Sequence, residues 1–336
     1  MPRIVCEVRL EPPALERLDQ LCPGEVATVA PHDAGWELPP DLARTVEILL
    51  CKRPPDNLND LAALRLIQIS TVGYEHLRER GFADRPVQVC NARGIFDTAI
   101  AEWCVAMMIA LARDLRGMLR NQDHAVWMRS DRYQQEVRGS TVGLWGYGGI
   151  GRATARLAKA LGMTVHVLAR HGVGRRDGYY TPPDAGDPDG RLPDRVFSPA
   201  ERTEFLGGLD FLVLALPHTR DSDGLIGEAE LRALPRHAFL LNPARGPIVQ
   251  EAALLQALRQ GTIAGAALDT HFAYPLPADH PLWRFPNVIL TPHVSGADRS
   301  RQFPARIGEL IVANVERYLI GQPLLNELTR REWLEA

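Results

Sequence analysis

The stretch of residues 141–170, TVGLWGYGGIGRATARLAKALGMTVHVLAR, constrains the fold of this chain more than any other. It reads as a short apolar strand, a glycine turn, a helix with small and apolar residues, and a second apolar strand, which is typical of a βαβ unit. The turn has the spacing Gly146-x-Gly148-x-x-Gly151. An ordinary glycine-rich loop of an α/β protein is the alternative, but the order of the elements favours a site for a dinucleotide pyrophosphate at the helix N-terminus.

The composition limits the class of protein. With 336 residues, 46% of them hydrophobic and 24% charged, the chain has the size of about two globular domains. A net charge of −3 and the lack of a long Lys/Arg run argue against nucleic acid as a partner. The opening MPRIVCEVRL does not resemble a signal peptide, and no apolar run is long enough for a membrane span, so we expect a cytoplasmic protein that binds no membrane.

The cysteines give no sign of a metal or redox site. All five lie in the first third of the chain, and none belongs to a CxxC pair. We therefore expect buried free thiols and no bound metal, with the cysteines at positions 6, 22, 51, 90 and 104.

Two groups of apolar strands predict two parallel α/β domains. The first group, at residues 3–10, 46–51, 66–70 and 87–90, precedes the glycine turn. After the turn, strands are expected at 211–216, 238–242, 265–269 and 288–290, and helices after Gly227, at 251–260 and at 301–319.

Two segments lie between these groups. From Thr98 onward, a continuous helix of more than twenty residues is expected, and its apolar first half predicts burial between domains or subunits. Residues 171–200 are rich in Gly, Pro, Asp and Arg without periodicity, which predicts a surface loop or insertion.

Polar residues follow three of the later strands. Arg245 lies in NPARG, Asp269 ends GAALD, and His293 lies in TPH. Because ligands of a doubly wound sheet bind at the carboxyl ends of its strands, we expect these side chains to lie beside the dinucleotide. An arginine that holds a carboxylate and polarises a carbonyl, with a histidine that transfers a proton, outlines a hydride-transfer site.

Nearly the whole chain resembles the D-isomer-specific 2-hydroxyacid dehydrogenases. The resemblance rests on LRLIQISTVGYEHL, Ala101-Glu102, GYGGIG, LALPHT, NPARG, GAALDT, HPLWRFPNVILTPHVSG and YLIGQPLLNEL, which occur in this order. It implies two Rossmann-like, doubly wound parallel-sheet domains with an interdomain cleft and a homodimer formed through the cofactor domain. The implied substrate domain comprises residues 1–100 and 294–336, and the implied dinucleotide-binding domain residues 101–293.

The resemblance also implies roles for individual residues. Arg245 matches the substrate-binding arginine and His293 the acid/base, while Val72 and Gly73 match the loop whose N–H groups hold the substrate acid group. Asp269 matches a contact to the nicotinamide amide, with a simple strand cap as the alternative. The cofactor-binding set implied in this way comprises Gly146, Tyr147, Gly148, Gly149, Ile150, Gly151, Leu216, Pro217, Ala244 and Asp269.

One departure from the family pattern concerns the cofactor. The acidic residue that ends the second strand in NAD-dependent relatives is expected near Ala169, but the chain reads Ala169-Arg170-His171, with Arg175 and Arg176 close behind. An arginine in place of an aspartate suits a ribose 2′-phosphate. We therefore expect Arg170 to bind the cofactor and NADP(H) to be favoured over NAD(H), the alternative being a solvated loop arginine.

A second departure concerns the acid/base. The family usually has a glutamate five residues after the aspartate, paired with the catalytic histidine, and Tyr274 occupies that position here. We expect Tyr274 to belong to the catalytic set, although a one-residue shift could bring Asp279 to the imidazole. A smaller change is Ile100, where the family often has threonine.

These observations predict an NADP(H)-dependent oxidoreductase that interconverts a small 2-keto acid and a D-2-hydroxy acid. Oxidation of a small anion such as phosphite or formate is one alternative, since relatives with these substrates share the scaffold. A dinucleotide-sensing protein without turnover is the other. Loss of the glutamate favours the sensor, whereas retention of Arg245 and His293 favours the enzyme.

Overall fold

The computed structural model describes the chain except for residues 33–34, 78–84, 132–133, 184, 331 and 333–336. The chain divides into two compact units. Unit 1 comprises Met1–Ile95, Asp177–Pro182 and Arg299–Ala336, and unit 2 comprises Phe96–Arg176 and Pro183–Asp298. From its resemblance, the sequence predicts boundaries near residues 100 and 293, and no pattern in it predicts that Asp177–Pro182 joins unit 1.

Unit 1 is built on a parallel sheet with the strand order β2-β1-β3-β4-β5. Its central strands are mostly apolar, as in the sequence VEILLC of β3, where Glu47 is the one charged residue, because helices and loops cover both faces of the sheet. Helices α1 and α9 pack against each other. The elements are β1 Arg3–Cys6, α1 Pro12–Leu21, β2 Val26–Thr28, α2 Pro40–Thr45, β3 Val46–Cys51, β4 Leu66–Ile69, β5 Gln88–Cys90 and α9 Gln302–Leu319.

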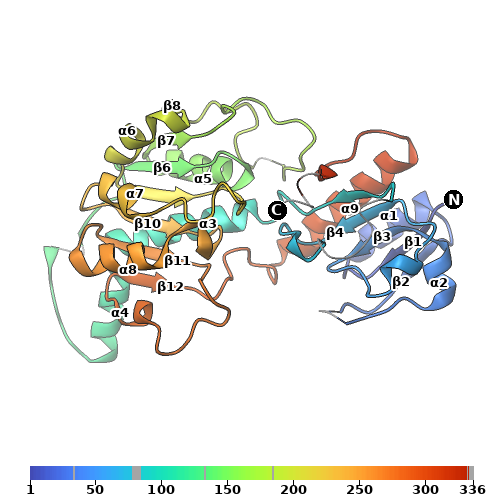
Figure 1. Cartoon of the computed structure of the whole chain (residues 1–336), viewed down its shortest axis with the longest axis horizontal. Coiled ribbons are helices and arrows are strands. Elements are labelled where there is room, and N and C mark those ends of the chain that lie inside the picture. The colour runs from blue at the N-terminus through green and yellow to red at the C-terminus, as the bar shows by residue number, and fades with distance from the viewer. Residues whose placement is uncertain (33–34, 78–84, 132–133, 184, 331, 333–336) are drawn as a thin grey trace. The chain divides into compact units, whose positions relative to one another are not determined.

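Unit 2 is built on a seven-stranded parallel sheet with the order β12-β11-β10-β9-β6-β7-β8 (Figure 1). The strand order reverses between β6 and β9. In a doubly wound sheet, ligands are expected to bind at the carboxyl ends of the strands at such a reversal. Its strands are β6 Thr141–Trp145, β7 Thr164–Leu168, β8 Arg195–Phe197, β9 Phe211–Leu214, β10 Phe239–Asn242, β11 Gly265–Leu268 and β12 Val288–Leu290. Its helices are α3 Asp97–Ala112, α4 Leu115–Asp123, α5 Gly149–Ala160, α6 Arg202–Gly207, α7 Glu228–Ala233 and α8 Glu251–Gln260.

Each face of this sheet has its own hydrophobic core. In β9, Phe211 and Val213 join the core formed with α3 and α5, whereas Leu212 and Leu214 join the core formed with α6, α7 and α8. This alternation follows from the two-residue period of a strand. Two parallel-sheet α/β units with helices packed on the sheets confirm the predicted fold class.

One expectation about secondary structure is wrong, one needs a refinement, and one strand was missed. The long helix predicted from Thr98 is broken after Ala112, because Asp114 has φ +43° and its side chain caps α4 by accepting a hydrogen bond from the Gly117 N–H at 3.2 Å. The predicted loop 171–200 contains strand β8. Strand β2, which lies at the edge of its sheet and is only partly buried, was not predicted.

The cysteine prediction is confirmed, since all five are buried and free. Burial raises the pKa of the Cys6 thiol to about 11 and that of Cys104 to about 12, so these thiols remain protonated at neutral pH. In the part of the chain that the structure describes, no helix has the length and apolar character that crossing a membrane requires.

Candidate active site

The glycine turn connects β6 to α5 beside the point where the strand order of unit 2 reverses. Gly146 has φ +101°, and a Cβ atom at this position would lie 2.4 Å from the carbonyl oxygen of Ala215. A Cβ atom at Gly151 would lie 2.5 Å from the Gly146 carbonyl oxygen. Both positions therefore require glycine, one for the turn and one for the close approach of helix and strand.

The start of α5 fits a dinucleotide pyrophosphate. Gly148 is the N-cap of α5 and, as a glycine, has no side chain that could cap the N–H groups of the first turn, which contains Gly149 and Ile150. The guanidinium of Arg176 lies close to Gly148: a Cβ atom added to this glycine would be 3.5 Å from Arg176 Nη1. The helix dipole and this cation both favour an anion. The Asp97 carboxylate lies against Gly149, so a phosphate bound here would share the helix N-terminus with one acidic side chain.

Arg152 and Tyr147 tie the insertion that follows β7 to the glycine turn. The buried Tyr147 hydroxyl donates to the Asp187 carboxylate at 2.6 Å, and the Arg152 guanidinium lies 4.9 Å from the centroid of the Tyr147 ring. Arg152 also donates to the carbonyl oxygens of Asp187, Val173 and Gly174. The Tyr147 side chain is thus directed toward Asp187 in the insertion, which its place in the glycine motif did not predict.

Arg170 lies two residues after the carboxyl end of β7. Its Nη1 atom lies 3.2 Å from Asp221 Oδ2, and both side chains are exposed. An exposed pair of this kind contributes little to stability, about 0–1 kcal/mol, so Arg170 retains the freedom to bind an anionic group of a ligand.

The residues expected to lie along the cofactor follow β9 and β10. Leu216 packs on the edge of the hydrophobic core, and the carbonyl oxygen of Pro217 accepts a hydrogen bond from the Ser222 hydroxyl at 2.8 Å. Ala244 is buried, and its N–H donates to the Asn242 side chain at 3.0 Å. These segments therefore follow β9, which lies next to β6, and β10, which lies on the other side of β9.

Arg245 projects from a turn that Asn242 holds in place. The Asn242 amide donates to the Arg245 carbonyl oxygen at 2.8 Å while its oxygen accepts the N–H of Ala244. The Arg245 guanidinium is partly exposed and donates to the Ala244 carbonyl oxygen at 2.8 Å. A buried side chain thus fixes the backbone that carries the partly exposed cation.

His293 lies on a turn that Asp269 holds. The exposed His293 has φ +57°, which is uncommon for a residue other than glycine, and its N–H donates to the Thr291 carbonyl oxygen at 3.0 Å. The fully buried Asp269 carboxylate accepts the Thr291 hydroxyl at 2.5 Å and the N–H groups of Val294 and Ser295, both at 2.9 Å. Asp269 therefore stabilises the loop on both sides of His293.

Two further side chains hold the same turn and were not predicted. Trp103 of α3 donates its indole N–H to the Thr291 hydroxyl at 3.1 Å. The buried His271 imidazole donates from Nε2 to the Thr291 carbonyl oxygen at 2.8 Å, and its Nδ1 has no hydrogen-bond partner among the described residues. A polar residue at position 271, next to the strand that ends at Asp269, was the only sequence signal for this contact.

Tyr274 lies beside His293 and within the electrostatic reach of Arg245. Its ring centroid is 5.5 Å from that of His293, and its hydroxyl accepts the N–H of His271 at 3.2 Å. Burial raises the pKa of Tyr274, and the nearby charge of Asp269 acts in the same direction, while the His271 hydrogen bond and the Arg245 charge oppose it. The phenol is therefore neutral at neutral pH. The structure thus brings Arg245, Tyr274 and His293 together within unit 2.

The predicted substrate loop belongs to unit 1. The Asn91 amide donates to the Val72 carbonyl oxygen and the Thr71 hydroxyl donates to the Gly73 carbonyl oxygen, both at 2.8 Å. Hydrogen bonds from two neighbouring side chains thus fix the path of this loop after β4.

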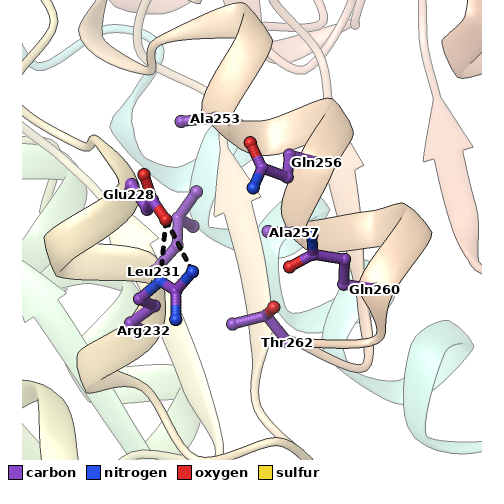
Figure 2. A pocket seen from close by; sticks show the side chains of 8 residues that line it. All are labelled: Glu228, Leu231, Arg232, Ala253, Gln256, Ala257, Gln260 and Thr262. Atoms are coloured by element: carbon purple, nitrogen blue, oxygen red, sulfur yellow. Dashed lines mark hydrogen bonds and ion pairs between the residues drawn. The ribbon is translucent and has the colours of Figure 1, made fainter.

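A shallow pocket elsewhere in unit 2 lies between α7 and α8 (Figure 2). Leu231 and Ala257 line it, and Arg232 on its rim is hydrogen-bonded to Glu228 at 2.9 Å. It involves none of the predicted site residues, and we assign no ligand to it.

Comparison with known proteins gives a consistent result. The sequence model for "D-isomer specific 2-hydroxyacid dehydrogenase, NAD binding domain" matches residues 105–295. A glyoxylate reductase of Thermofilum pendens is 30% identical over 337 residues, which cover 96% of this chain and 92% of that protein.

Two solved structures are similar over almost the whole chain. A D-isomer specific 2-hydroxyacid dehydrogenase family protein of Aeromonas salmonicida has a TM-score of 0.79 and 26% identity, covering 98% of this chain and 99% of that one. A D-isomer specific 2-hydroxyacid dehydrogenase of Xanthobacter autotrophicus, in complex with NADPH and MES, has a TM-score of 0.76 and 29% identity, covering 98% of each chain. The chain therefore belongs to the family of D-isomer specific 2-hydroxyacid dehydrogenases, which are NAD(P)-dependent oxidoreductases.

Proposed function

We propose that this protein reduces a small 2-keto acid to the D-2-hydroxy acid and that NADPH is its preferred cofactor. The observation that supports this most is the grouping of Arg245, Tyr274 and His293 at strand ends of the sheet that also carries the glycine turn. In this proposal unit 2 binds the cofactor and unit 1 contributes the substrate loop.

Arg245 binds and polarises the substrate. Its planar guanidinium pairs with the carboxylate through two parallel hydrogen bonds and places positive charge next to the keto oxygen. Charge that develops on this oxygen during reduction is stabilised by the same side chain. The backbone N–H groups of Val72 and Gly73 complete the binding of the acid group.

His293 supplies the proton. When bound, NADPH provides a hydride for the carbonyl carbon, and the protonated imidazole donates a proton to the carbonyl oxygen, which gives the hydroxy acid. The reverse reaction requires neutral His293 as the base. Asp269, Thr291 and His271 hold the turn that carries His293, and in this proposal Asp269 also contacts the nicotinamide amide.

Two features support NADPH as the preferred cofactor. The residues after β7 include Arg170, and Arg176 lies beside Gly148, so this end of the site is cationic. The Xanthobacter relative contains NADPH. A 2′-phosphate gains charge-assisted hydrogen bonds at such a site.

A substrate panel tests the proposal. Glyoxylate, hydroxypyruvate and phenylpyruvate should be assayed with NADPH and NADH, and we expect turnover of at least one acid with NADPH as the better cofactor. Glyoxylate is included because the Thermofilum relative is a glyoxylate reductase. Activity on phosphite or formate alone would favour the small-anion alternative. Tight NADPH binding without turnover of any compound would favour the sensor.

We also propose a homodimer and a cytoplasmic location. Side chains on α4 and in the segment after it, among them Leu119, Val126 and Met128, are exposed, and Trp127 is 98% exposed. Such a cluster is typical of a surface covered by a partner. The buried free thiols suit a reducing compartment. Sedimentation should give a particle of two chains and Trp127→Glu a single chain, whereas a monomeric unmodified protein would disprove the dimer.

Replacing Tyr274 by glutamate should move the alkaline limb of the reduction profile upward by about one pH unit. The neutral phenol puts no negative charge beside His293, whereas a carboxylate there would stabilise the imidazolium and keep the proton donor charged to higher pH. The acidic limb of the oxidation profile should move in the same direction, because oxidation needs the neutral imidazole. The measurement is kcat/KM against pH in both directions.

Tyr274→Gln is the matched control, because it has the shape of glutamate without the charge. Its profile should follow that of the unmodified protein, even if the rate falls. Identical profiles for the Glu and Gln variants would mean that another acid, such as Asp279, supports His293 or that proton transfer does not limit the rate.

A further inference from the structure

The chain passes between the two units four times. The two expected domain boundaries account for only two of these passages. The additional passages lie in the insertion after β7, where Asp177–Pro182 belongs to unit 1 although Arg176 and Pro183 belong to unit 2. We call Asp177–Pro182 the strap.

Asn326 holds the strap on unit 1. Asn326 is buried, its N–H donates to the Gly178 carbonyl oxygen at 2.8 Å, and its side-chain oxygen accepts the Tyr180 N–H at 3.1 Å. The Asn326 amide group also donates to the carbonyl oxygens of Asn91 and Arg93, at 3.1 and 2.8 Å. One side chain thus joins the strap to the segment that follows β5.

Tyr180 makes two further contacts. Its hydroxyl donates to Glu309 of α9 at 2.6 Å, and burial together with this carboxylate raises the pKa of the phenol, so it remains a donor at neutral pH. Its carbonyl oxygen lies only 2.2 Å from the place of a Cβ atom at Gly94, so the strap and Gly94 are in close contact. The strap therefore has a defined seat on unit 1.

The seat adjoins the substrate loop. The guanidinium of Arg93 lies 5.9 Å from the ring centroid of Tyr179 in the strap and 6.0 Å from that of Tyr74, which follows Gly73 directly. Arg93 also pairs with Glu332 at 2.8 Å. A cation between two aromatic rings stabilises their arrangement by about 0.5–1 kcal/mol for each ring at exposed sites.

The residue that precedes the strap in the chain lies at the glycine turn of unit 2. Arg176, which precedes Asp177 in the chain, lies 3.5 Å from the place of a Cβ atom at Gly148. The carbonyl oxygens of Val173 and Gly174, just before it, are held by Arg152 in α5. An anion bound at the glycine turn would therefore act on the residue that is covalently joined to the strap.

We propose that the strap positions the substrate loop and couples it to the cofactor site, so that NADPH and the substrate acid group bind cooperatively. The inference rests on the proposed function, because it assigns cofactor to the glycine turn and substrate to Val72 and Gly73. Tyr180 is a positioning residue in this scheme, acting through the strap, Arg93 and Tyr74.

The test is the coupling between two ligands. The Kd of NADPH is measured by fluorescence with and without saturating oxalate, a flat dicarboxylate that resembles a 2-keto acid but has no reducible carbonyl. Oxalate should tighten NADPH binding in the unmodified protein by a factor of roughly 5 to 150. Tyr180→Phe should lower this factor about three- to tenfold and raise KM for the keto acid with little change in kcat.

Tyr318→Phe is the matched control. Tyr318 also donates its hydroxyl to a glutamate of unit 1, Glu47, at 2.6 Å, but it lies outside the strap. Its loss should leave the coupling factor unchanged. A second pair tests the aromatic contact, since Tyr179→Ala should weaken the coupling whereas Tyr179→Phe, which keeps the ring, should not.

Limited trypsin digestion gives a readout that needs no activity. Release of the strap should speed cleavage after Arg175 or Arg176 in Tyr180→Phe relative to Tyr318→Phe, and NADPH should slow this cleavage in the unmodified protein. The proposal is overturned if NADPH and oxalate bind independently. It is also overturned if the Tyr180→Phe and Tyr318→Phe variants show equal coupling, even if the enzyme reduces 2-keto acids. Absence of turnover with intact coupling would instead remove the proposed function alone.

Discussion

Replacing Arg245 by alanine is expected to lower kcat/KM for 2-keto acid reduction by about 10³-fold while the Kd of NADPH changes by less than about twofold. Loss of one electrostatic donor at the reacting oxygen costs about 10²–10³-fold, and the carboxylate loses its binding partner as well. In the proposed function the cofactor is held mainly at the glycine turn, which follows β6, whereas Arg245 follows β10 of the same sheet. Steady-state kinetics and fluorescence titration measure the two quantities.

Two variants sharpen this experiment. Arg245→Lys keeps the charge but loses the planar fork, so its activity should lie between those of the unmodified protein and the alanine variant. Arg232→Ala removes an exposed arginine of the same unit that pairs with Glu228 (Figure 2), and it should have normal kinetics. If Arg245→Ala keeps activity within a few-fold of the unmodified protein, the substrate is bound elsewhere.

The sequence predicts the strands of both sheets well where a strand is mostly apolar. The expected segments around β3, β10 and β12 correspond to strands within about two residues. Such runs identify themselves because parallel strands are buried on both faces. Strands β2 and β8 lack this signal, since they lie at sheet edges and most of their residues are not buried.

The break between α3 and α4 shows a limit of periodicity. The helical pattern continues through residues 98–122, apolar in its first half and charged later, and only the local geometry of Asp114, with φ +43°, ends one helix and starts the next. An aspartate is a known N-cap residue, but its presence alone does not distinguish a cap from a solvated position in a helix.

The site was predictable to the extent that it follows from strand ends. Arg245, Asp269 and His293 each come within three residues of the end of a strand, and parallel topology brings such residues to one edge. The contacts of Trp103 and His271 with Thr291 are tertiary, and the polar residue at position 271 is the only local signal for either of them. The strap depends on Asn326, which lies far along the chain, so the composition of residues 171–200 could not predict its seat.

The cofactor preference should reverse when Arg170 is replaced by aspartate. NADPH should have the higher kcat/KM in the unmodified protein, because Arg170 can donate to the 2′-phosphate once it leaves its exposed partner Asp221. One charge-assisted contact is worth about 1.5–3 kcal/mol, or roughly ten- to a hundredfold in kcat/KM. The new carboxylate would repel the phosphate and accept the ribose hydroxyl of NADH, which adds to the change.

Two controls separate this effect from a general change in charge. Arg191→Asp changes the same charge in the same insertion, where Arg191 pairs loosely with Asp189 at 3.7 Å, and it should leave the preference intact. Asp221→Asn removes the competitor of the phosphate, so it should tighten NADPH binding a few-fold without affecting NADH. If kcat/KM of the unmodified protein with NADH equals or exceeds that with NADPH, Arg170 is a solvated loop residue. The missing acid after β7 then does not determine the cofactor.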